Sequence, residues 1–234
     1  MHRLQNPLVI LLWLALFYLA IFALHFNVMG WPATVRSEMM AGVSLVMLLC
    51  GLIFYRLAGA GGAQRYPTRG ALLALAAAII AVFAQAIVAR QSFTVALDPT
   101  LVAGQLVRYV VIIGLAEELW FRGLWMHAAG ERFVLAVIVG ALLFGLFHLP
   151  LGSGRVVTLT ALGFLYAAAR WRGAPIWSLA LAHGTVNTWL TTIAPATAWR
   201  FDPTVSQGIF AGVVIGAAII MIVSTRPATP TRTP

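Results

Sequence analysis

The chain has 234 residues, of which 62% are hydrophobic and only 9% are charged. An ordinary soluble domain is about 45–50% apolar and about 25% charged, so this composition excludes both a soluble enzyme and a disordered chain. It predicts an all-α fold in which a polytopic bundle of membrane-spanning helices makes up the protein, with no soluble domain.

Eight apolar stretches are expected to be transmembrane helices, each of which needs about 20 residues. In chain order they are 8–29, 39–57, 71–89, 101–126, 133–149, 156–169, 174–193 and 208–223. The sixth is short and contains glycine. We expect a single transmembrane domain over residues 1–224, with its motifs in 101–194. The Pro- and Thr-rich residues 225–234 are expected to form a disordered cytoplasmic tail.

The distribution of arginine predicts the orientation of the chain. All 15 basic residues are arginines, which gives a formal net charge of +9. With eight spans both termini lie on one side of the membrane. The arginines on that side are Arg3, Arg56, Arg65, Arg69, Arg132, Arg170, Arg172, Arg226 and Arg232, whereas the other side has Arg36, Arg90, Arg155 and Arg200. This excess places both termini in the cytoplasm, in what we expect to be a bacterial cytoplasmic membrane. The expected partner of these dispersed charges is the lipid bilayer and not nucleic acid.

The span 101–126 contains three charged side chains, Glu117, Glu118 and Arg122. On insertion scales each costs about 2.5–3.5 kcal/mol at the centre of a membrane helix. Glu118 and Arg122 are four residues apart, with the acid on the N-terminal side, so we expect them to pair. Glu117 is rotated by about 100° from Glu118, and it therefore needs another partner or has another purpose.

Two later spans carry polar side chains at a similar depth. Phe144 and His148 are four residues apart in the fifth span, and so are His183 and Asn187 in the seventh, so each pair lies on one helix face. At a rise of 1.5 Å per residue, Glu117 and these polar groups lie roughly 14–22 Å from the cytoplasmic ends of their helices. We expect one shared polar cavity. A purely structural polar network is the alternative.

A carboxylate, two imidazoles and a carboxamide in a cavity of low dielectric can hydrolyse a bond through an activated water molecule. In this scheme Glu117 is the base, a histidine helps to deprotonate the water, and hydrogen-bond donors stabilise the oxyanion. A serine or cysteine nucleophile is disfavoured, because no Gly-x-Ser-x-Gly occurs and the one cysteine, Cys50, lies in a remote span.

Zinc is the main chemical alternative. Glu117, His148 and His183 can together make a three-ligand site with one open position. The segment His-Gly-Thr-Val-Asn at 183–187 has the spacing of the zinc motif His-Glu-x-x-His. However, Gly184 stands in place of the glutamate and Asn187 in place of the second histidine. Asparagine is a poor zinc ligand.

Three motifs occur in a fixed order: Glu-Glu-Leu-x-Phe-Arg-Gly at 117–123, Phe-x-x-x-His at 144–148 and His-x-x-x-Asn at 183–187. Together they resemble the CPBP family, the CAAX-processing and bacteriocin-processing intramembrane endopeptidases, also called the Abi family. The resemblance covers residues 115–188. It implies an eight-helix membrane protease that cuts peptide bonds in a cavity open to the cytoplasmic side.

The resemblance also implies a role for each matching residue. Glu117 and His148 would activate the water, and His183 and Asn187 would form the oxyanion hole. The residues that would support the site are Glu118, Arg122 and Phe144. The implied mechanism is of the glutamate type, with no metal or other cofactor, and a zinc metalloprotease is the alternative.

The substrate implied by the resemblance is a membrane-associated peptide, of the prenylated CAAX or the bacteriocin type, reached from the membrane or the cytoplasm. Bacteriocin maturation, bacteriocin immunity and surface-protein processing all fit it. Two other functions fit buried Glu and His: a proton-coupled transporter, and a non-catalytic immunity or scaffold protein of the membrane. The transporter is disfavoured, because the sequence has no detectable repeat and no paired broken helices.

Overall fold

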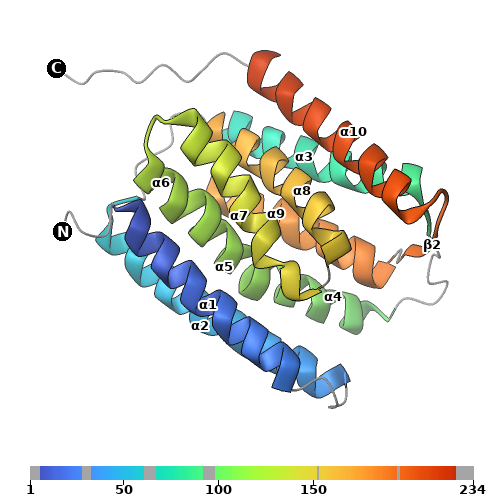
Figure 1. The fold of residues 1–234 in the computed structure, drawn as a ribbon, viewed down its shortest axis with the longest axis horizontal. Helices are drawn as coiled ribbons and strands as arrows, with labels where there is room; N and C mark the ends of the chain where they lie inside the picture. The colour runs from blue at the N-terminus through green and yellow to red at the C-terminus, as the bar shows by residue number, and fades with distance from the viewer. Residues whose placement is uncertain are drawn as a thin grey trace.

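The computed structural model describes residues 6–27, 33–60, 67–91, 98–151, 153–193 and 196–224. They form a bundle of helices joined by short connections (Figure 1). The uninterrupted long helices are α1 (Pro7–Asn27), α2 (Ala33–Leu57), α3 (Pro67–Val88), α8 (Ser153–Trp171) and α10 (Pro203–Ser224). The predicted tail, 225–234, lies outside the described residues.

The central helix of the bundle runs without a break from Pro99 to Ala129, over 31 residues. Asp98 caps it, since its side chain accepts a hydrogen bond from the Thr100 amide (2.8 Å) and Pro99 occupies the first turn. Wider π-helical turns alternate with α-helical turns along it. Its parts are α4 (Pro99–Val107), η2 (Arg108–Gly114), α5 (Leu115–Glu118), η3 (Leu119–Leu124) and α6 (Trp125–Ala129).

The remaining helical segments complete the bundle. They are η4 (Val134–Val139), α7 (Gly140–Phe147), η5 (Leu149–Leu151), α9 (Ile176–Thr188) and η6 (Trp189–Ile193). Each of the eight predicted stretches thus contains a helix, and the all-α prediction is confirmed.

The number of membrane crossings stays a prediction. Among the described residues, four helices are long and apolar enough to cross a membrane: Glu38–Leu57, Thr68–Val88, Pro99–Ala129 and Pro203–Ser224. Two apolar helical stretches, Pro7–Ala23 and Val134–Phe147, are shorter than a full crossing requires.

A small antiparallel sheet is a feature that the composition does not predict. β1 (Ala89–Gln91) pairs with β2 (Ala196–Trp199), with Ala89 opposite Trp199. The sequence predicts that Ala89 ends the helix 71–89, whereas in the structure it is the first residue of β1 and pairs with a distant segment. Arg200 holds the same corner, because its Nε donates to the Ala89 carbonyl (3.1 Å) and its amide donates to the Val88 carbonyl (2.9 Å). These bonds tie the end of α3 to the segment before α10.

Two kinds of packing hold the helices together. α3 presents a stripe of fully buried alanines to α8, α9 and α10: Ala74, Ala77, Ala81 and Ala84. Small residues let helix backbones approach closely, which favours association of helices in a membrane. Larger buried side chains, including Trp120 and Phe121, pack α1 and α2 against the central helix.

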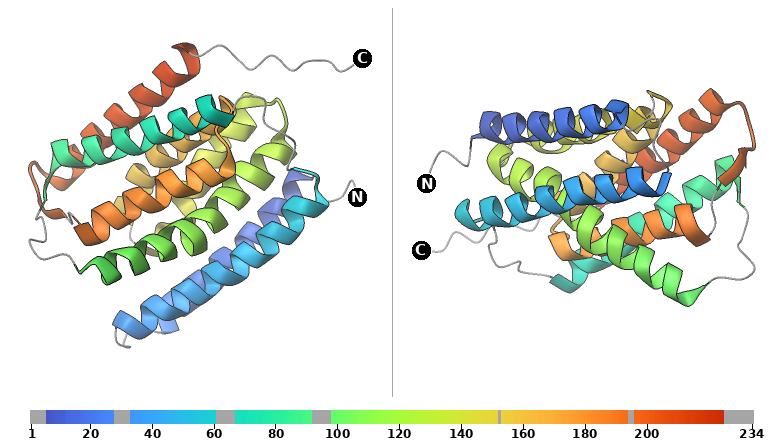
Figure 2. Two further views of the ribbon diagram at one scale, coloured as in Figure 1. Left: turned by 180° about the vertical axis from the view of Figure 1, so that it is seen from behind. Right: turned by 90° about the horizontal axis from the view of Figure 1, so that it is seen from below.

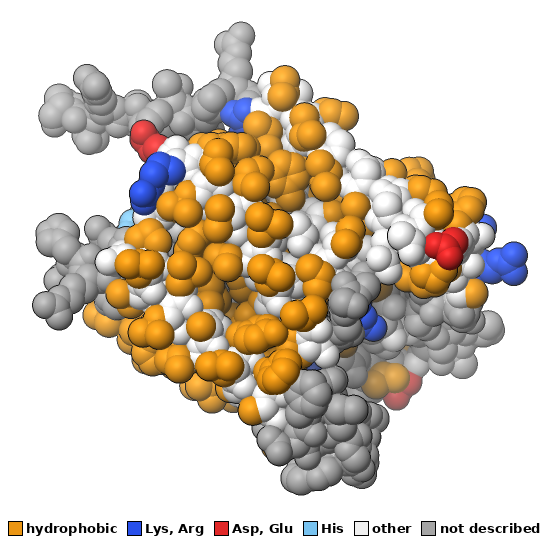
Figure 3. Space-filling view, viewed as in Figure 1, with side chains coloured by type: hydrophobic (Ala, Val, Ile, Leu, Met, Phe, Trp, Pro, Cys, Tyr) orange, Lys and Arg blue, Asp and Glu red, His pale blue; other side chains and the backbone are white. Residues whose placement is uncertain are grey.

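The outward faces of the helices are apolar. Leu8 and Val223, for example, are 70% and 78% exposed. In Figure 3 apolar side chains cover most of one face of the bundle, and the charged side chains on that face lie near its two ends. Such a surface is suited to hydrocarbon and not to water, and the chain is an integral membrane protein.

The two ends of the bundle differ. α1 begins at one of them, beside α6, and α10 ends at the same end of the bundle on its other side; we call this the terminal end (Figures 1 and 2). The β1–β2 sheet and the start of α4 lie at the other, which we call the sheet end.

Candidate active site

Glu117 and Glu118 are consecutive buried residues on α5. The π-helical segments η2 and η3 flank α5 on both sides, and π-helical turns inside α-helices are frequent at functional sites. Because α5 keeps the ordinary α-helical twist, the two carboxylates point in directions about 100° apart. They therefore have different partners.

Glu118 is completely buried and sits at the centre of an ionic network. Its Oε1 lies 3.3 Å from Nη1 of Arg122, so the predicted pair is present. The same oxygen accepts a hydrogen bond from Nδ1 of His183 (2.9 Å). Arg122 is held in turn by the Gly163 carbonyl, to which its Nη2 donates (3.2 Å), and by the Phe144 ring, whose centroid lies 4.3 Å from the guanidinium carbon. The network joins the central helix to α7, α8 and α9.

Glu117 lies between two imidazoles from different helices. Its Oε1 is 3.6 Å from Nε2 of His148, and its Oε2 is 3.7 Å from Nε2 of His183. His148 directly follows α7, and His183 is on α9. The fold thus brings the imidazoles of His148 and His183 to the Glu117 carboxylate, and the sequence predicts all three of these residues for the site.

The partners of each imidazole define where its hydrogens lie. Nδ1 of His148 is 2.8 Å from the Phe144 carbonyl oxygen, which can only accept, so this nitrogen carries a hydrogen. Nε2 of a neutral His148 is then a lone pair facing Glu117. Nδ1 of His183 lies 2.9 Å from Oε1 of Glu118, and an ionised carboxylate can only accept, so this nitrogen also carries a hydrogen. Nε2 of His183 can therefore donate a hydrogen bond only when both ring nitrogens carry a hydrogen.

Two aromatic rings hold these imidazoles. The Phe144 centroid lies 4.7 Å from that of His148 and 5.9 Å from that of His183. Tyr166 of α8 stacks on the face of His183, at 5.4 Å and an angle of 20°. The sequence points to Phe144 but not to Tyr166, because an aromatic residue in an apolar helix is usually part of the core and no local spacing relates Tyr166 to His183.

Gly184 explains how His183 comes close to the central helix. A Cβ added at position 184 would lie 2.5 Å from the backbone nitrogen and Cα of Val110. Gly114 makes the matching approach from the central helix, where an added Cβ would lie 3.0 Å from the Ala180 carbonyl oxygen. The two glycines let the helices cross at backbone distance. The residue that replaces the zinc-motif glutamate is thus a packing residue.

A cavity of about 260 Å³ opens beside Glu117, and we call it the polar cavity. The predicted catalytic residues in its lining are Glu117, His148, His183 and Asn187. The half-buried Asn187 is one turn beyond His183 on α9. The lining also contains polar side chains to which the sequence does not point: Ser44, Tyr109, Arg155 and Thr191.

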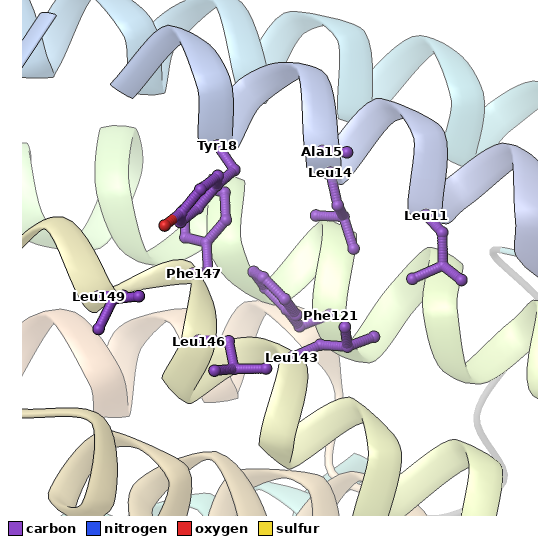
Figure 4. Close-up of a pocket in the computed structure, with 9 residues that line it drawn as sticks. All are labelled: Leu11, Leu14, Ala15, Tyr18, Phe121, Leu143, Leu146, Phe147 and Leu149. Atoms are coloured by element: carbon purple, nitrogen blue, oxygen red, sulfur yellow. The ribbon is translucent and has the colours of Figure 1, made fainter. Parts of the chain in front are cut away.

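A second space is an apolar groove of about 380 Å³, whose lining residues are drawn in Figure 4. It is formed by α1, α7, η3 and η5, and its lining residues are Leu11, Leu14, Ala15, Tyr18, Phe121, Leu143, Leu146, Phe147 and Leu149. Phe147 lines both the groove and the polar cavity, so the two spaces adjoin.

The polar cavity lies toward the sheet end of the bundle. Its lining includes Ile21 from the later part of α1, Met40 from the early part of α2 and Arg155 from the first turn of α8. All three positions are remote from the terminal end. The side of the membrane on which the terminal end lies, and the side to which the cavity opens, stay predictions.

The zinc alternative stays a prediction. Within the described ranges, no three His, Cys, Asp or Glu side chains are placed to hold a metal ion. Nε2 of His148 and Nε2 of His183 both face the Glu117 carboxylate, at 3.6 and 3.7 Å.

Fold and site together define a membrane-embedded helical protein with a buried Glu–His centre suited to the activation of water. The comparison with protein families agrees with this class: residues 99–189 match the family described as type II CAAX prenyl endopeptidase Rce1-like. The match confirms the resemblance to the CPBP family, and it contains all seven residues that the sequence predicts for the site. No curated protein and no solved structure matches the chain.

Proposed function

We propose that this protein is an intramembrane endopeptidase that hydrolyses peptide bonds of a membrane-associated peptide with an activated water molecule. The observation that carries the proposal is the Glu117 carboxylate between the Nε2 atoms of His148 and His183. The Rce1-like match of residues 99–189 supports it.

In the proposed reaction, a water molecule lies against the Glu117 carboxylate and the Nε2 lone pair of His148. Both groups accept hydrogen bonds, so they orient the water and raise its nucleophilicity. As the water oxygen attacks the peptide carbonyl carbon, Glu117 takes a proton. When the C–N bond breaks, this proton passes to the leaving nitrogen, which gives a carboxylic acid, an amine and the starting form of Glu117.

His183 and Asn187 are the proposed donors to the oxyanion. They lie one helical turn apart on α9 and both line the polar cavity. His183 donates from Nε2 in its doubly protonated form, because Nδ1 is already bonded to Glu118. A donor aimed at a developing oxyanion contributes about 10²–10³-fold to kcat.

The supporting residues act through His183. The Glu118 carboxylate orients the ring by its bond to Nδ1, and Arg122 holds that carboxylate in place. Phe144 packs against both imidazoles and under the Arg122 guanidinium. Loss of any of these contacts frees the ring to turn away from the reacting carbonyl.

The proposed substrate has an apolar part and a peptide part. The apolar groove suits a prenyl chain or the hydrophobic side chains of a bacteriocin-type peptide, and the adjoining polar cavity suits the scissile bond. The arginine distribution predicts that the terminal end lies in the cytoplasm, and the proposed substrate reaches the polar cavity from the membrane or from the cytoplasm.

Glu117→Gln tests the proposal, because it keeps the shape of the side chain and removes the proton acceptor. We expect turnover of a cleavable peptide by purified protein to fall by about 10²–10⁴-fold. Glu131→Gln is the control, since Glu131 is exposed in the connection after α6. Unchanged cleavage by a correctly inserted Glu117→Gln protein would exclude the proposed role.

A chelator tests the metal question separately. The glutamate mechanism predicts unchanged turnover after dialysis against a strong zinc chelator. Complete loss of turnover, reversed by added zinc, would favour the metalloprotease.

A further inference from the structure

Two arginines from different helices come together at the terminal end of the bundle. Arg69 is in the first turn of α3, which ends at the β1–β2 sheet, and Arg172 directly follows α8. The backbones beside them are in contact: a Cβ added at Gly70 would lie 2.9 Å from the Cα of Ala174 and would also meet the Gly173 carbonyl. Figure 2 shows the start of α3 beside the turn between α8 and α9. The two positive charges are therefore neighbours.

The guanidinium of Arg172 lacks an acceptor within the described part of the chain. Its Nε and Nη1 atoms are buried and have no hydrogen-bond partner among the described residues. No described carboxylate forms an ion pair with Arg172 or with Arg69. Burial and the neighbouring Arg69 charge both lower the pKa of Arg172. An anionic acceptor from outside the chain would satisfy the buried N–H groups and offset the repulsion between the two charges.

Helix stability and membrane orientation explain single arginines at this end but not this pair. The last turn of α8 favours a cation at position 172, whereas the first turn of α3 disfavours one at position 69. The positive-inside rule favours arginine at a cytoplasmic end, but it does not require two of them to be adjacent. Arg170 shows the contrasting arrangement, because its Nη1 donates to the Ala174 carbonyl (2.9 Å). Arg170 has a protein acceptor, and Arg172 faces one that must be supplied.

An apolar stripe continues from Arg69 along the outer face of α3. Leu72, Leu75 and Ile79 follow Arg69 at intervals of three and four residues, so the four residues lie on one face of the helix. Each of the three apolar side chains is more than half exposed. Positive charge at the end of the helix, followed by apolar side chains along it, matches a phospholipid, whose headgroup and acyl chain are joined in the same order.

We propose that Arg69 and Arg172 bind the phosphate of an anionic phospholipid, and that one of its acyl chains lies along the stripe of Leu72, Leu75 and Ile79. Guanidinium groups pair with phosphate through parallel, charge-assisted hydrogen bonds. The stripe favours a lipid over free phosphate, which would use the charges alone. The site is distinct from the polar cavity, whose described lining includes neither arginine. It does not depend on the proposed endopeptidase function.

The test compares two lipids with the same acyl chains, dioleoylphosphatidylglycerol, which is anionic, and dioleoylphosphatidylcholine, which is zwitterionic. Each is titrated into full-length protein in detergent, and the first bound lipid is measured by native mass spectrometry. We expect the anionic lipid to bind more tightly. Arg172→Gln should weaken its binding about fivefold and leave the zwitterionic lipid unchanged. Arg69→Gln should do the same, and because Arg69 is exposed this variant should keep its fold.

Two controls separate the site from general surface charge and from free phosphate. Arg56→Gln removes the same charge from an exposed position in the last turn of α2, at the same end of the bundle, and should leave both affinities unchanged. Ammonium phosphate at the concentration of the lipid should not displace the anionic lipid, because phosphate has no acyl chain to bury.

Four outcomes would overturn the proposal. Equal affinity for the two lipids would show that the site does not select an anion. Equal weakening of both lipids by Arg172→Gln and by Arg69→Gln would assign the arginines a structural role. An effect of Arg56→Gln as large as that of Arg172→Gln would assign the binding to diffuse surface charge. Displacement of the anionic lipid by phosphate would make free phosphate the ligand.

Discussion

Arg122→Met should be strongly destabilising, because it removes one partner of an ion pair that is closed to water. Glu118 and Arg122 are 0% and 1% exposed, so no solvent can replace the lost charge. Removing one partner of a buried pair costs about 3–5 kcal/mol, since the other charge stays buried without compensation. Glu118 would keep its bond to Nδ1 of His183 (2.9 Å) and lose its contact with the guanidinium (3.3 Å).

The measurement is thermal unfolding of the purified protein in detergent, followed by circular dichroism. A loss of 1 kcal/mol lowers Tm by about 2–4 °C for a chain of this size, so we expect a decrease of about 6–20 °C. The double variant Glu118→Leu/Arg122→Met should recover part of this loss, because neither charge is then buried alone. Its activity should stay low, since His183 has lost the carboxylate that orients it.

Arg56→Met is the matched control, because Arg56 is exposed in the last turn of α2. It should change the free energy of unfolding by no more than about 0.5 kcal/mol. If Arg122→Met were as stable as this control, the ion pair would contribute nothing to the fold and the reasoning would be refuted.

Three further predictions follow from the packing and the orientation of the bundle. Gly184→Ala should lose about 1–3 kcal/mol of stability and most of its activity, because the added Cβ meets backbone at 2.5 Å, whereas Gly208→Ala, with no atom within 4 Å, should be nearly neutral. Tyr166→Leu should lower kcat far more than it raises KM by removing the ring stacked on the imidazole, and Tyr166→Phe should keep nearly full activity. In a Cys50→Ser background, Arg200→Cys at the sheet end should react in intact cells with a membrane-impermeant maleimide, as termini in the cytoplasm require.

Each of these has a result that contradicts it. An active and stable Gly184→Ala protein would show that close backbone contact is not needed to place α9. Equal loss of kcat in the two Tyr166 variants would assign the effect to the hydroxyl and not to the ring. Protection of the cysteine at position 200 from the maleimide would place the polar cavity on the cytoplasmic side.

Part of the site can be predicted from the sequence, because it depends on the geometry of a single helix. The Glu118–Arg122 contact is predictable because residues four apart on a helix face the same way. The same rule relates His183 to Asn187. The helical class is predictable because long apolar runs with few charges have few other stable forms in a membrane.

Other features depend on contacts between segments far apart in the chain. Tyr166 comes to lie on the His183 ring only because α8 and α9 pack around the same central helix. Gly184 has its role only because α9 crosses that helix at Val110. The β1–β2 sheet pairs segments more than 100 residues apart, and neither strand has a pattern strong enough to predict it.

By itself the sequence determined the membrane environment, the helical segments and the residue types available for chemistry, because composition and helical periodicity are local properties. Only the tertiary structure decided that Glu117 lies between two histidines, that Arg155 shares their cavity, and that this cavity lies away from the terminal end of the bundle. All three features depend on distances between helices. Those distances are set by tertiary packing, in which small residues such as Gly184 and Gly114 let two helix backbones approach closely.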